Sequence, residues 1–297
     1  MPEGVCARAG RWMAAFGAVG LLWAWGLIGE ARAATTDHAE GRVSLRRSGD
    51  LRVATFNASL HRAESGELLR DLTKPGNEQA AAVAEILQWV NPDIVLINEF
   101  DYDEAGRSLK GFLQHYVGVS QGGLDPLNYD HVFVARSNTG VASGLDLDGD
   151  GVMMDDADDA FGFGMFEGQY SFVILSKFPI DESSVRTFQT FRWRDMPNNL
   201  LPVGRYDPQA QEILRLSSKN HVDLPIKVNG EVIHFLASHP TPPVFDDGTD
   251  RNLDGFDDRD GVTPVFDWNG RRNSDEIRFW ADYLDPTRDD YIYDDAG

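Results

Sequence analysis

The sequence predicts an α/β fold in which mixed β-sheets pack against helices. From Leu51 onward, short apolar runs alternate with stretches that have helical periodicity. A strand–helix–strand order comes first and a hairpin signal follows later in the chain, and together they favour mixed sheets covered by helices. No repeat occurs at the period of a solenoid protein, so a repeat architecture is not expected.

The first elements are a strand, a helix and a second strand. The run Leu51–Asn57 has the composition of a strand. Asn77 can cap a helix that extends to about Val90, and Asn91-Pro92 ends it. Its apolar residues share one face: Ala80, Val83, Ala84, Leu87 and Val90. The continuous apolar run Ile94–Ile97 follows, as expected of a strand that is covered on both faces.

The later elements are strands, a hairpin and a last helix. Residues 131–135 and 171–175 have strand composition. Residues 222–228 and 231–237, joined by Asn229-Gly230, predict a hairpin with a type I′ turn, because this dipeptide accepts positive φ angles. Ser274 can cap a helix that runs through Leu284. Its predicted buried face contains Ile277, Trp280, Ala281 and Leu284.

Residues 1–33 have the pattern of a secretory signal peptide. Arg8 and Arg11 precede an apolar run, and Ala31-Arg32-Ala33 follows it. The alternative is an uncleaved anchor, since a run of about 17 apolar residues is at the short limit for a membrane span. Residues 34–50 are polar and predict a linker, so the folded domain would occupy 51–297. Cys6, the single cysteine, lies in the signal segment, which favours a secreted or periplasmic bacterial protein without disulfides and, after cleavage, without a membrane span.

The chain is strongly acidic, with a formal net charge of −21. Such a surface repels polyanions unless a basic patch or bound cations intervene. The charge therefore weighs against long nucleic acids as substrates without excluding them, because a metal site can supply positive charge. Solubility and cation binding fit this balance better, and a solvated acidic surface without a function is the plain alternative.

Three polar residues lie at the ends of apolar, strand-like runs. Asn57 closes the first run, Glu99 closes the run that begins at Pro92, and His239 closes Val232–His239. The carboxyl ends of strands are where open α/β sheets place ligands. Taken alone, Asn57 is more often a turn residue, Glu99 could pair with an arginine, and His239 could be structural. Together, an amide, a carboxylate and an imidazole suit a divalent metal and a phosphate ester.

The order and wording of these segments resemble the endonuclease/exonuclease/phosphatase superfamily. The resemblance covers roughly residues 51–284. It includes a further segment, 175–180, with the sequence Leu-Ser-Lys-Phe-Pro-Ile. Residues 217–221 and 269–276 are similar to an exported bacterial subfamily. The segments that carry the resemblance are 53–57, 92–99, 170–180 and 235–243.

The resemblance implies a four-layer α/β sandwich, in which two mixed sheets pack face to face and helices cover the outside. It implies a metal-dependent phosphoester hydrolase with Mg²⁺ (or Mn²⁺), in which water attacks phosphorus. Glu99 would be the metal ligand, Asn57 would help to bind the metal or the phosphate, and His239 would contact the scissile phosphate. The substrate could be a nucleic acid, a phospholipid head group or a small phosphate ester, and no protein partner is evident.

The chain departs from the family pattern near its end. The family normally has a Gly-Asp-x-Asn motif after the position of Leu284 and a later Asp-His pair, and neither occurs in residues 285–297. We therefore expect a fragment of a longer product that lacks about two strands of one sheet; a natural pseudoenzyme is the alternative. In either case, the purified 34–297 chain is expected to show no Mg²⁺-dependent phosphodiesterase turnover.

Two acidic loops match the first half of a calcium-binding loop, with oxygen ligands at alternate positions before a glycine. The first contains Asp146, Asp148 and Asp150, and the second contains Asp250, Asn252 and Asp254. Neither has an acidic residue at position twelve, so neither is a standard EF-hand. In the first loop a nearby aspartate could substitute: Asp155, Asp156, Asp158 or Asp159. They predict Ca²⁺ binding, with a solvated, turn-rich loop as the alternative.

A few basic residues could contact phosphate. Arg272 is the main candidate, with Arg271 and Lys219 beside it, although each could be an ordinary surface charge. A second hypothesis, from another functional class, is a catalytically inactive, calcium-binding extracellular module on the same scaffold. A serine hydrolase that uses His239 is set aside, because no Gly-x-Ser-x-Gly elbow occurs in the sequence.

Overall fold

The computed structural model describes residues 50–153, 157–245 and 267–297, which belong to one compact unit that begins at Ser48. The predicted signal peptide at 1–33 and the linker up to residue 49 lie outside the described residues. The second acidic loop, with Asp250, Asn252 and Asp254, lies outside them as well. No helix within the described ranges combines the length and the apolar character that a bilayer span requires.

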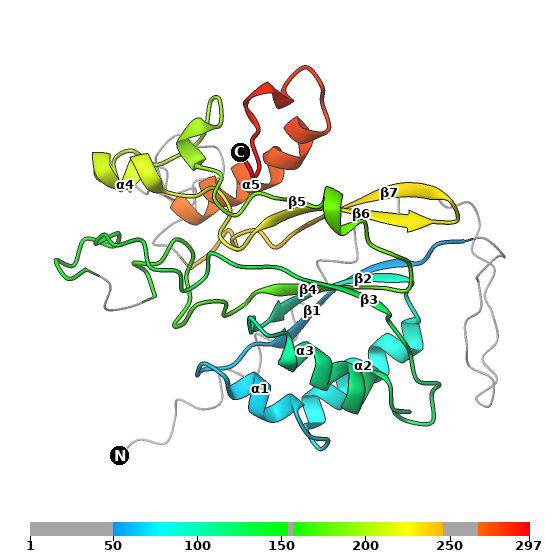
Figure 1. Cartoon of the computed structure of the whole chain (residues 1–297). Coiled ribbons are helices and arrows are strands. Elements are labelled where there is room, and N and C mark those ends of the chain that lie inside the picture. The colour runs from blue at the N-terminus through cyan, green and yellow to red at the C-terminus, as the bar shows by residue number, and fades with distance from the viewer. Residues whose placement is uncertain (1–49, 154–156, 246–266) are drawn as a thin grey trace, which may run out of the picture. The chain divides into compact units, whose positions relative to one another are not determined.

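The described residues form seven strands and five α-helices (Figure 1). One π-helical segment, Leu113–Val117, and three short 3-10 helices, Glu182–Ser184, Trp193–Asp195 and Asp289–Tyr291, complete them. The strands and α-helices, in chain order, are β1 (Val53–Leu60), α1 (Glu67–Leu72), α2 (Glu78–Val90), β2 (Ile94–Phe100), α3 (Arg107–Phe112), β3 (His131–Val134), β4 (Phe172–Ser176), β5 (Arg186–Thr187), α4 (Pro208–Ile213), β6 (His221–Val228), β7 (Glu231–Ser238) and α5 (Trp268–Tyr283).

The first sheet is mixed, with strand order β1-β2-β4-β3. β1 and β2 are parallel, and the other two pairs are antiparallel. β2 is buried on both faces, as its continuous apolar run predicts. Val95 and Ile97 pack into the core formed with α1, α2 and α3, whereas Ile94 and Leu96 pack toward the second sheet.

The second sheet contains β5, β6 and β7 in that order, and its described strands are all antiparallel. The expectation that this sheet is mixed is therefore wrong for the described strands. Val222, Leu224 and Ile226 of β6 pack against the first sheet. On the opposite face of β6, the ring of His221 lies 4.9 Å from that of Phe279 in α5.

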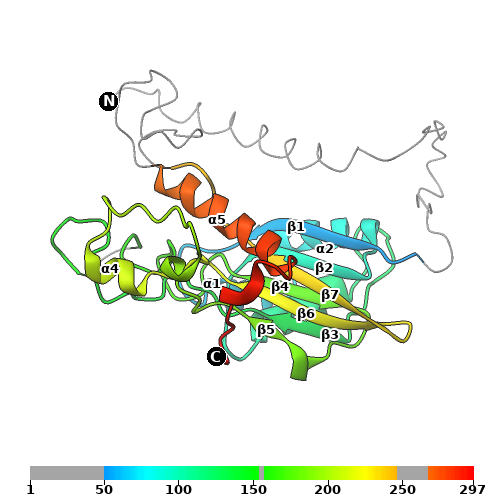
Figure 2. The same cartoon turned by 90° about the horizontal axis from the view of Figure 1, so that it is seen from above.

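The layers are helix, sheet, sheet and helix, so the predicted four-layer sandwich is confirmed. Helices α1, α2 and α3 cover the outer face of the first sheet, and α5 covers the outer face of the second (Figures 1 and 2). Figure 2 places β7 on the β1 side of the sandwich. There, Val53 and Ile233, which point between the sheets, are 51% and 37% exposed. This edge of the sandwich is therefore open among the described residues.

The helix predicted from Asn77 and the predicted hairpin are confirmed. The side chain of Asn77 accepts a hydrogen bond of 2.9 Å from the amide of Ala80, and α2 ends at Val90. The other four residues of the predicted apolar face are buried, whereas Val90, the last residue of the helix, is 41% exposed. Between β6 and β7, Asn229 and Gly230 have φ angles of 52° and 92°, as a type I′ turn requires.

The last helix differs from its prediction in its start and in its buried face. α5 begins at Trp268 rather than near Ser274, and Asp267 caps it by accepting a 3.0 Å hydrogen bond from the amide of Gly270. Ile277 and Leu284 are largely exposed. The helix buries a mainly acidic face because most of these carboxylates meet donors from other segments, which a hydrophobic pattern does not reveal. The buried residues are Asp275, Glu276, Phe279 and Asp282.

Candidate metal and phosphate site

Glu99, near the end of β2, is held by two side chains from β1 and the residues that follow it. Its Oε1 atom accepts a 2.8 Å hydrogen bond from Nδ2 of Asn57. Its Oε2 atom lies 3.1 Å from Nδ1 of His61. The structure thus brings together two of the three predicted strand-end residues and adds His61. The sequence analysis missed this histidine, although its place just after β1 was a signal for it.

β1 does not end at Asn57, as the sequence suggested, but continues to Leu60. Its pairing with β2 becomes irregular between Asn57 and Leu60. The amide of Ser59 donates a 3.0 Å hydrogen bond to Oδ1 of Asn57, which makes a local turn within the strand. This irregularity lets the Asn57 side chain bond to both the backbone of its own strand and Glu99.

Three residues around Glu99 have left-handed backbone conformations. The φ angles of Ser59, Glu99 and Tyr170 are 51°, 59° and 58°. For residues other than glycine, this region costs roughly 1–2 kcal/mol each. The ring of Tyr170 lies 4.6 Å from that of His61, so the strained residues belong to one neighbourhood. Strain of this kind persists where the surrounding structure enforces it, and it is concentrated at functional sites.

The two carboxylates at this end of β2, Glu99 and Asp101, differ in pKa. Burial raises the pKa of Glu99, but hydrogen bonds from His61 and Asn57 outweigh it and lower the pKa to about 2. Burial raises the pKa of Asp101 to about 6, although the amides of Tyr170 and Arg62 donate hydrogen bonds to it. Glu99 is therefore the firmly ionised group at the strand end.

His239 follows β7 directly and belongs to the same site. Burial, and next the positive charge of Lys219, lower its pKa to about 4, so the ring is neutral at pH 7. The charge of Glu99 acts on this ring, which places the two groups close together. The Nδ1 atom of His239 is buried and has no hydrogen-bond partner among the described residues. A buried polar atom without a partner costs free energy, and a bound ligand group can supply one.

The donor set around Glu99 fits a hard divalent cation. Carboxylate and amide oxygens are preferred ligands of Mg²⁺. Besides Glu99 and Asn57, the Oδ1 atom of Asn98 is buried and has no hydrogen-bond partner in the described part of the chain. Asn98 pairs with Asn57 across β1 and β2, so both amides lie at the same level of the sheet. The residues therefore match the chemistry of the metal that the resemblance implies.

Arg272 is bonded to the backbone of other segments. Its Nε atom donates a 2.9 Å hydrogen bond to the carbonyl of Leu216, and its Nη2 atom donates to the carbonyls of Phe161 and Arg215. These bonds join three segments of the chain, so the structure gives Arg272 a structural role. The predicted phosphate contact of Arg272 stays a prediction. Lys219, in contrast, is buried and acts electrostatically on both His239 and Glu99.

The first acidic loop gathers a set of carboxylates that differs from the predicted one. Single oxygens of Asp146, Asp148 and Asp159 lie within 4.8 Å of one another. Asp150 is not part of this group, and its carboxylate accepts a 2.7 Å hydrogen bond from the amide of Val152. Asp159 is buried and also accepts a hydrogen bond from the amide of Leu147. The predicted Ca²⁺ ligands Asp146 and Asp148 come together, with Asp159 in place of Asp150.

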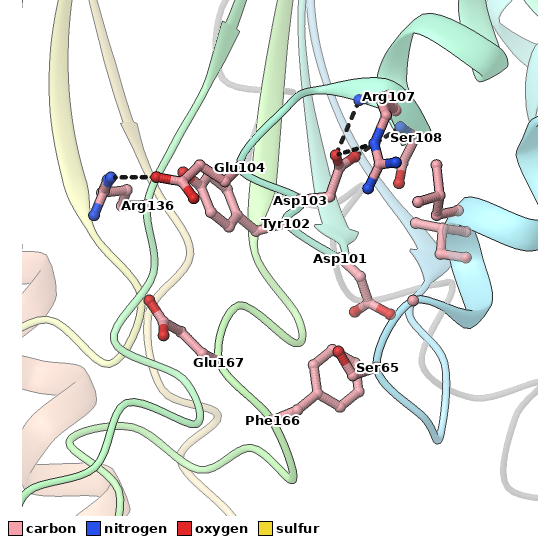
Figure 3. A pocket seen from close by; sticks show the side chains of 13 residues that line it. Ser65, Asp101, Tyr102, Asp103, Glu104, Arg107, Ser108, Arg136, Phe166 and Glu167 are labelled. Atoms are coloured by element: carbon pink, nitrogen blue, oxygen red, sulfur yellow. Dashed lines mark hydrogen bonds and ion pairs between the residues drawn. The ribbon is translucent and has the colours of Figure 1, made fainter.

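A pocket of about 330 Å³ lies near the end of β2 (Figure 3). Asp101 lines it, and two arginines stand in its wall. Arg136 pairs with Glu104 at 3.3 Å, and the Nε atom of Arg107 lies 3.7 Å from Asp103. Since both guanidinium groups already face carboxylates, the pocket is less suited to a phosphate than the strand ends are.

The family model described as "Endonuclease/Exonuclease/phosphatase family" matches residues 54–289, which is most of the chain. The chain belongs to this family. Members of the endonuclease/exonuclease/phosphatase family are generally metal-dependent phosphoester hydrolases, and an oxygen-rich site at the strand ends agrees with that chemistry. No curated protein matches the chain.

Solved structures of this family are similar to the chain only at a distance. A family protein from Beutenbergia cavernae DSM 12333 is 15% identical, with a TM-score of 0.33, over 65% of this chain and 39% of that one. A family protein from Leptotrichia buccalis C-1013-b is 12% identical, with a TM-score of 0.33, over 64% and 53%. SmcL is 15% identical, with a TM-score of 0.30, over 65% and 49%. The chain thus spans about two fifths to one half of these structures.

Proposed function

We propose that the strand-end site binds Mg²⁺ or Mn²⁺ together with the phosphoryl group of a phosphoester, which water then hydrolyses. The observation that carries this proposal is the state of Glu99. Its carboxylate stays ionised although it is partly buried, and Asn57 and His61 hold both of its oxygens. An ionised carboxylate fixed in this way is a preorganised ligand for a cation.

The residues of the site divide the work between cation and phosphate. Glu99 and the amide oxygen of Asn98 would hold the cation, and Asn57 would assist by holding the Glu99 carboxylate in place. When bound, Mg²⁺ offsets the negative charge of the phosphate and of the transition state. His239 is neutral and has a single N–H group; in the tautomer that carries it on the unpaired Nδ1 atom, the ring can donate a hydrogen bond to a phosphoryl oxygen.

The substrate class remains that of a phosphodiester or a phosphomonoester: a nucleic acid, a phospholipid head group or a small phosphate ester. The net charge of −21 favours the smaller substrates over long nucleic acids. We also propose export to the periplasm or the medium, on the pattern of residues 1–33. Fractionation of cells that express the full chain tests this, and retention of the whole protein in the cytoplasm would contradict it.

The decisive experiment measures Mn²⁺ binding to the 34–297 protein by calorimetry and electron paramagnetic resonance. Glu99→Gln removes the ionised ligand but keeps the size of the side chain, and we expect it to weaken Mn²⁺ binding by about tenfold or more. Glu104→Gln is the matched control, because Glu104 is 83% exposed and lies on the loop after β2. Equal Mn²⁺ affinity in the wild type and Glu99→Gln would refute the proposal.

Hydrolysis is tested separately with bis-p-nitrophenyl phosphate and p-nitrophenyl phosphate. Because residues 285–297 contain neither Gly-Asp-x-Asn nor an Asp-His pair, we expect the 34–297 protein to bind metal without appreciable turnover. Robust turnover that Glu99→Gln abolishes would contradict that expectation and still support the site. Metal-dependent turnover that survives in Glu99→Gln would contradict the assignment of Glu99.

A calcium-binding module without catalysis is the second candidate function. The observation in its favour is the group formed by Asp146, Asp148 and Asp159. Two results together would favour this module over the hydrolase. Mn²⁺ binding would not depend on Glu99, and Ca²⁺ binding would be the same in Glu99→Gln and the wild type.

A further inference from the structure

Lys219 is a buried cation that has no ion-pair or hydrogen-bond partner in the described part of the chain. The residue is only 7% exposed. Burial lowers its pKa to about 8, while the charges of Glu276 and Glu99 act to raise it, so the group remains largely protonated at pH 7. Burying a charge without a hydrogen-bonded counter-charge is costly, and an anionic ligand would remove that cost.

The β6–β7 hairpin places Lys219 beside His239. His221, the first residue of β6, pairs with Ser238, the last residue of β7. Lys219 lies two residues before this pair, and His239 lies directly after it, so both stand at the same end of the ladder. The positive charge of Lys219 acts on the His239 ring, in agreement with this placement. The unpaired ammonium and the unpaired Nδ1 atom of His239 therefore share one end of the second sheet.

Glu276 of α5 joins the two segments that carry these groups. Its Oε1 atom accepts hydrogen bonds from the amide and the hydroxyl of Ser218, at 2.6 Å and 2.9 Å. Its Oε2 atom accepts a 2.6 Å hydrogen bond from the amide of Thr241. Ser218 precedes Lys219 directly, and Thr241 lies two residues after His239. One buried carboxylate thus fixes the backbone on both sides of the site. We call Glu276, Ser218 and Thr241 together the Glu276 clamp.

The other cations near this end of the sheet are already engaged. Arg272 donates to three backbone carbonyls. Arg62 pairs with Asp71 at 2.8 Å. Among the described residues near this end of the sheet, the charge of Lys219 is therefore left for a ligand. Its ammonium interacts electrostatically with Glu99, on whose side of the site the proposed function puts the phosphate.

We propose that Lys219 is a phosphate-binding residue of this site, and that the Glu276 clamp positions it next to His239. The inference rests on the proposed function and deepens it, because it names the group that binds the phosphoryl oxygens. It also replaces Arg272, which the sequence favoured for that role. The ligand class is a phosphate monoanion or dianion held between the metal-binding strand ends and the ammonium of Lys219. A charge-assisted hydrogen bond of this kind is stronger than a neutral one.

The test compares Lys219→Met with Lys227→Met in the 34–297 protein. Methionine keeps the length of the side chain and removes its charge. Lys227 is the matched control, because it lies on β6, is 51% exposed and pairs with Asp181 on the surface. Binding of inorganic phosphate is measured by calorimetry in the presence of saturating Mn²⁺, and Mn²⁺ binding is measured on its own. Melting temperatures are recorded without ligand.

We expect Lys219→Met to weaken phosphate binding by about tenfold or more, as the loss of a buried charge-assisted contact would. Mn²⁺ affinity should stay equal or rise, since a positive charge near Glu99 is removed. The melting temperature without ligand should stay equal or rise, because an unpaired buried charge is lost. Lys227→Met should leave all three quantities unchanged.

Phosphate affinity that is the same in Lys219→Met and the wild type would overturn the inference, as would a wild type that binds Mn²⁺ but no phosphate. In both cases the proposed function still stands if Mn²⁺ binding depends on Glu99. If Mn²⁺ binding does not depend on Glu99, the proposed function fails whatever Lys219 does. A fall in melting temperature together with lost phosphate binding would identify Lys219 as a structural residue and would also overturn the inference.

Discussion

Replacing Glu276 removes the carboxylate that joins α5 to the segments before β6 and after β7. The residue is 1% exposed, so water cannot replace its hydrogen bonds. Two variants separate its contacts. Glu276→Ala deletes all three bonds to Ser218 and Thr241. Glu276→Gln can keep its carbonyl oxygen toward Ser218, which bonds to a single carboxylate oxygen, but then its amide group faces the amide of Thr241.

The expected magnitudes follow from this geometry. Hydrogen bonds to a charged group contribute about 1.5–3 kcal/mol each, and a buried donor left without a partner costs about 1–3 kcal/mol. Glu276→Gln loses the bond to Thr241, so we expect a loss of about 1–3 kcal/mol in the free energy of unfolding. Glu276→Ala leaves both backbone amides without partners, so we expect a loss of about 3–5 kcal/mol, which is typical of breaking a buried charged network.

Urea denaturation of the 34–297 protein, followed by tryptophan fluorescence, measures these losses. Glu231→Gln is the control, because Glu231 is exposed at the start of β7, and it should change the free energy by less than about 0.5 kcal/mol. The reasoning is refuted if Glu276→Ala unfolds within about 0.5 kcal/mol of the wild type. It is also refuted if the glutamine variant is as unstable as the alanine variant, since the two must differ by the bonds to Ser218.

Three further predictions concern the acidic loop, the last helix and the strained backbone. Asp159→Asn should weaken Ca²⁺ binding in calorimetry, whereas Asp150→Asn should not, because only Asp159 joins the carboxylate group of the loop. In urea titrations Phe279→Ala should cost about 3–5 kcal/mol and Ile277→Ala less than about 0.5 kcal/mol, as the buried face of α5 requires. Ser59→Gly should stabilise the fold by up to about 1 kcal/mol, because glycine adopts its φ of 51° without strain; a loss would contradict the strain.

The elements that the sequence predicted well are those specified by neighbouring residues. The cap at Asn77 and the turn at Asn229-Gly230 each depend on side chains within a few positions, and both are confirmed. β2 could be predicted because a strand between two layers is apolar at every position. The place of Glu99 at the end of β2 followed from the same pattern.

The residues that sequence analysis misplaced depend on partners far along the chain. Asp275 and Glu276 of α5 point inward because they bond to residues 35 to 82 positions away, among them Trp193, Ser218 and Thr241. A hydrophobic pattern predicts an apolar face instead. The same reason applies to Arg272. Its carbonyl partners come from distant parts of the chain, so the sequence alone cannot show that the guanidinium bonds to the backbone.

The site concentrates features that each reduce stability. Glu99 and Tyr170 hold left-handed φ angles. Within the described ranges, Lys219 is a buried cation without an ion-pair partner, and His239 and Asn98 each keep a buried polar atom unpaired. Any one of these could be an accident of packing, but all of them lie at one end of the two sheets. A metal cation and a phosphate together would relieve the unpaired atoms, because the cation takes amide oxygens as ligands and the phosphate oxygens accept hydrogen bonds from Lys219 and from the Nδ1–H tautomer of His239. The defects are thus complementary to one pair of ligands of opposite charge, and that complementarity is a stronger argument for the site than any single residue within it.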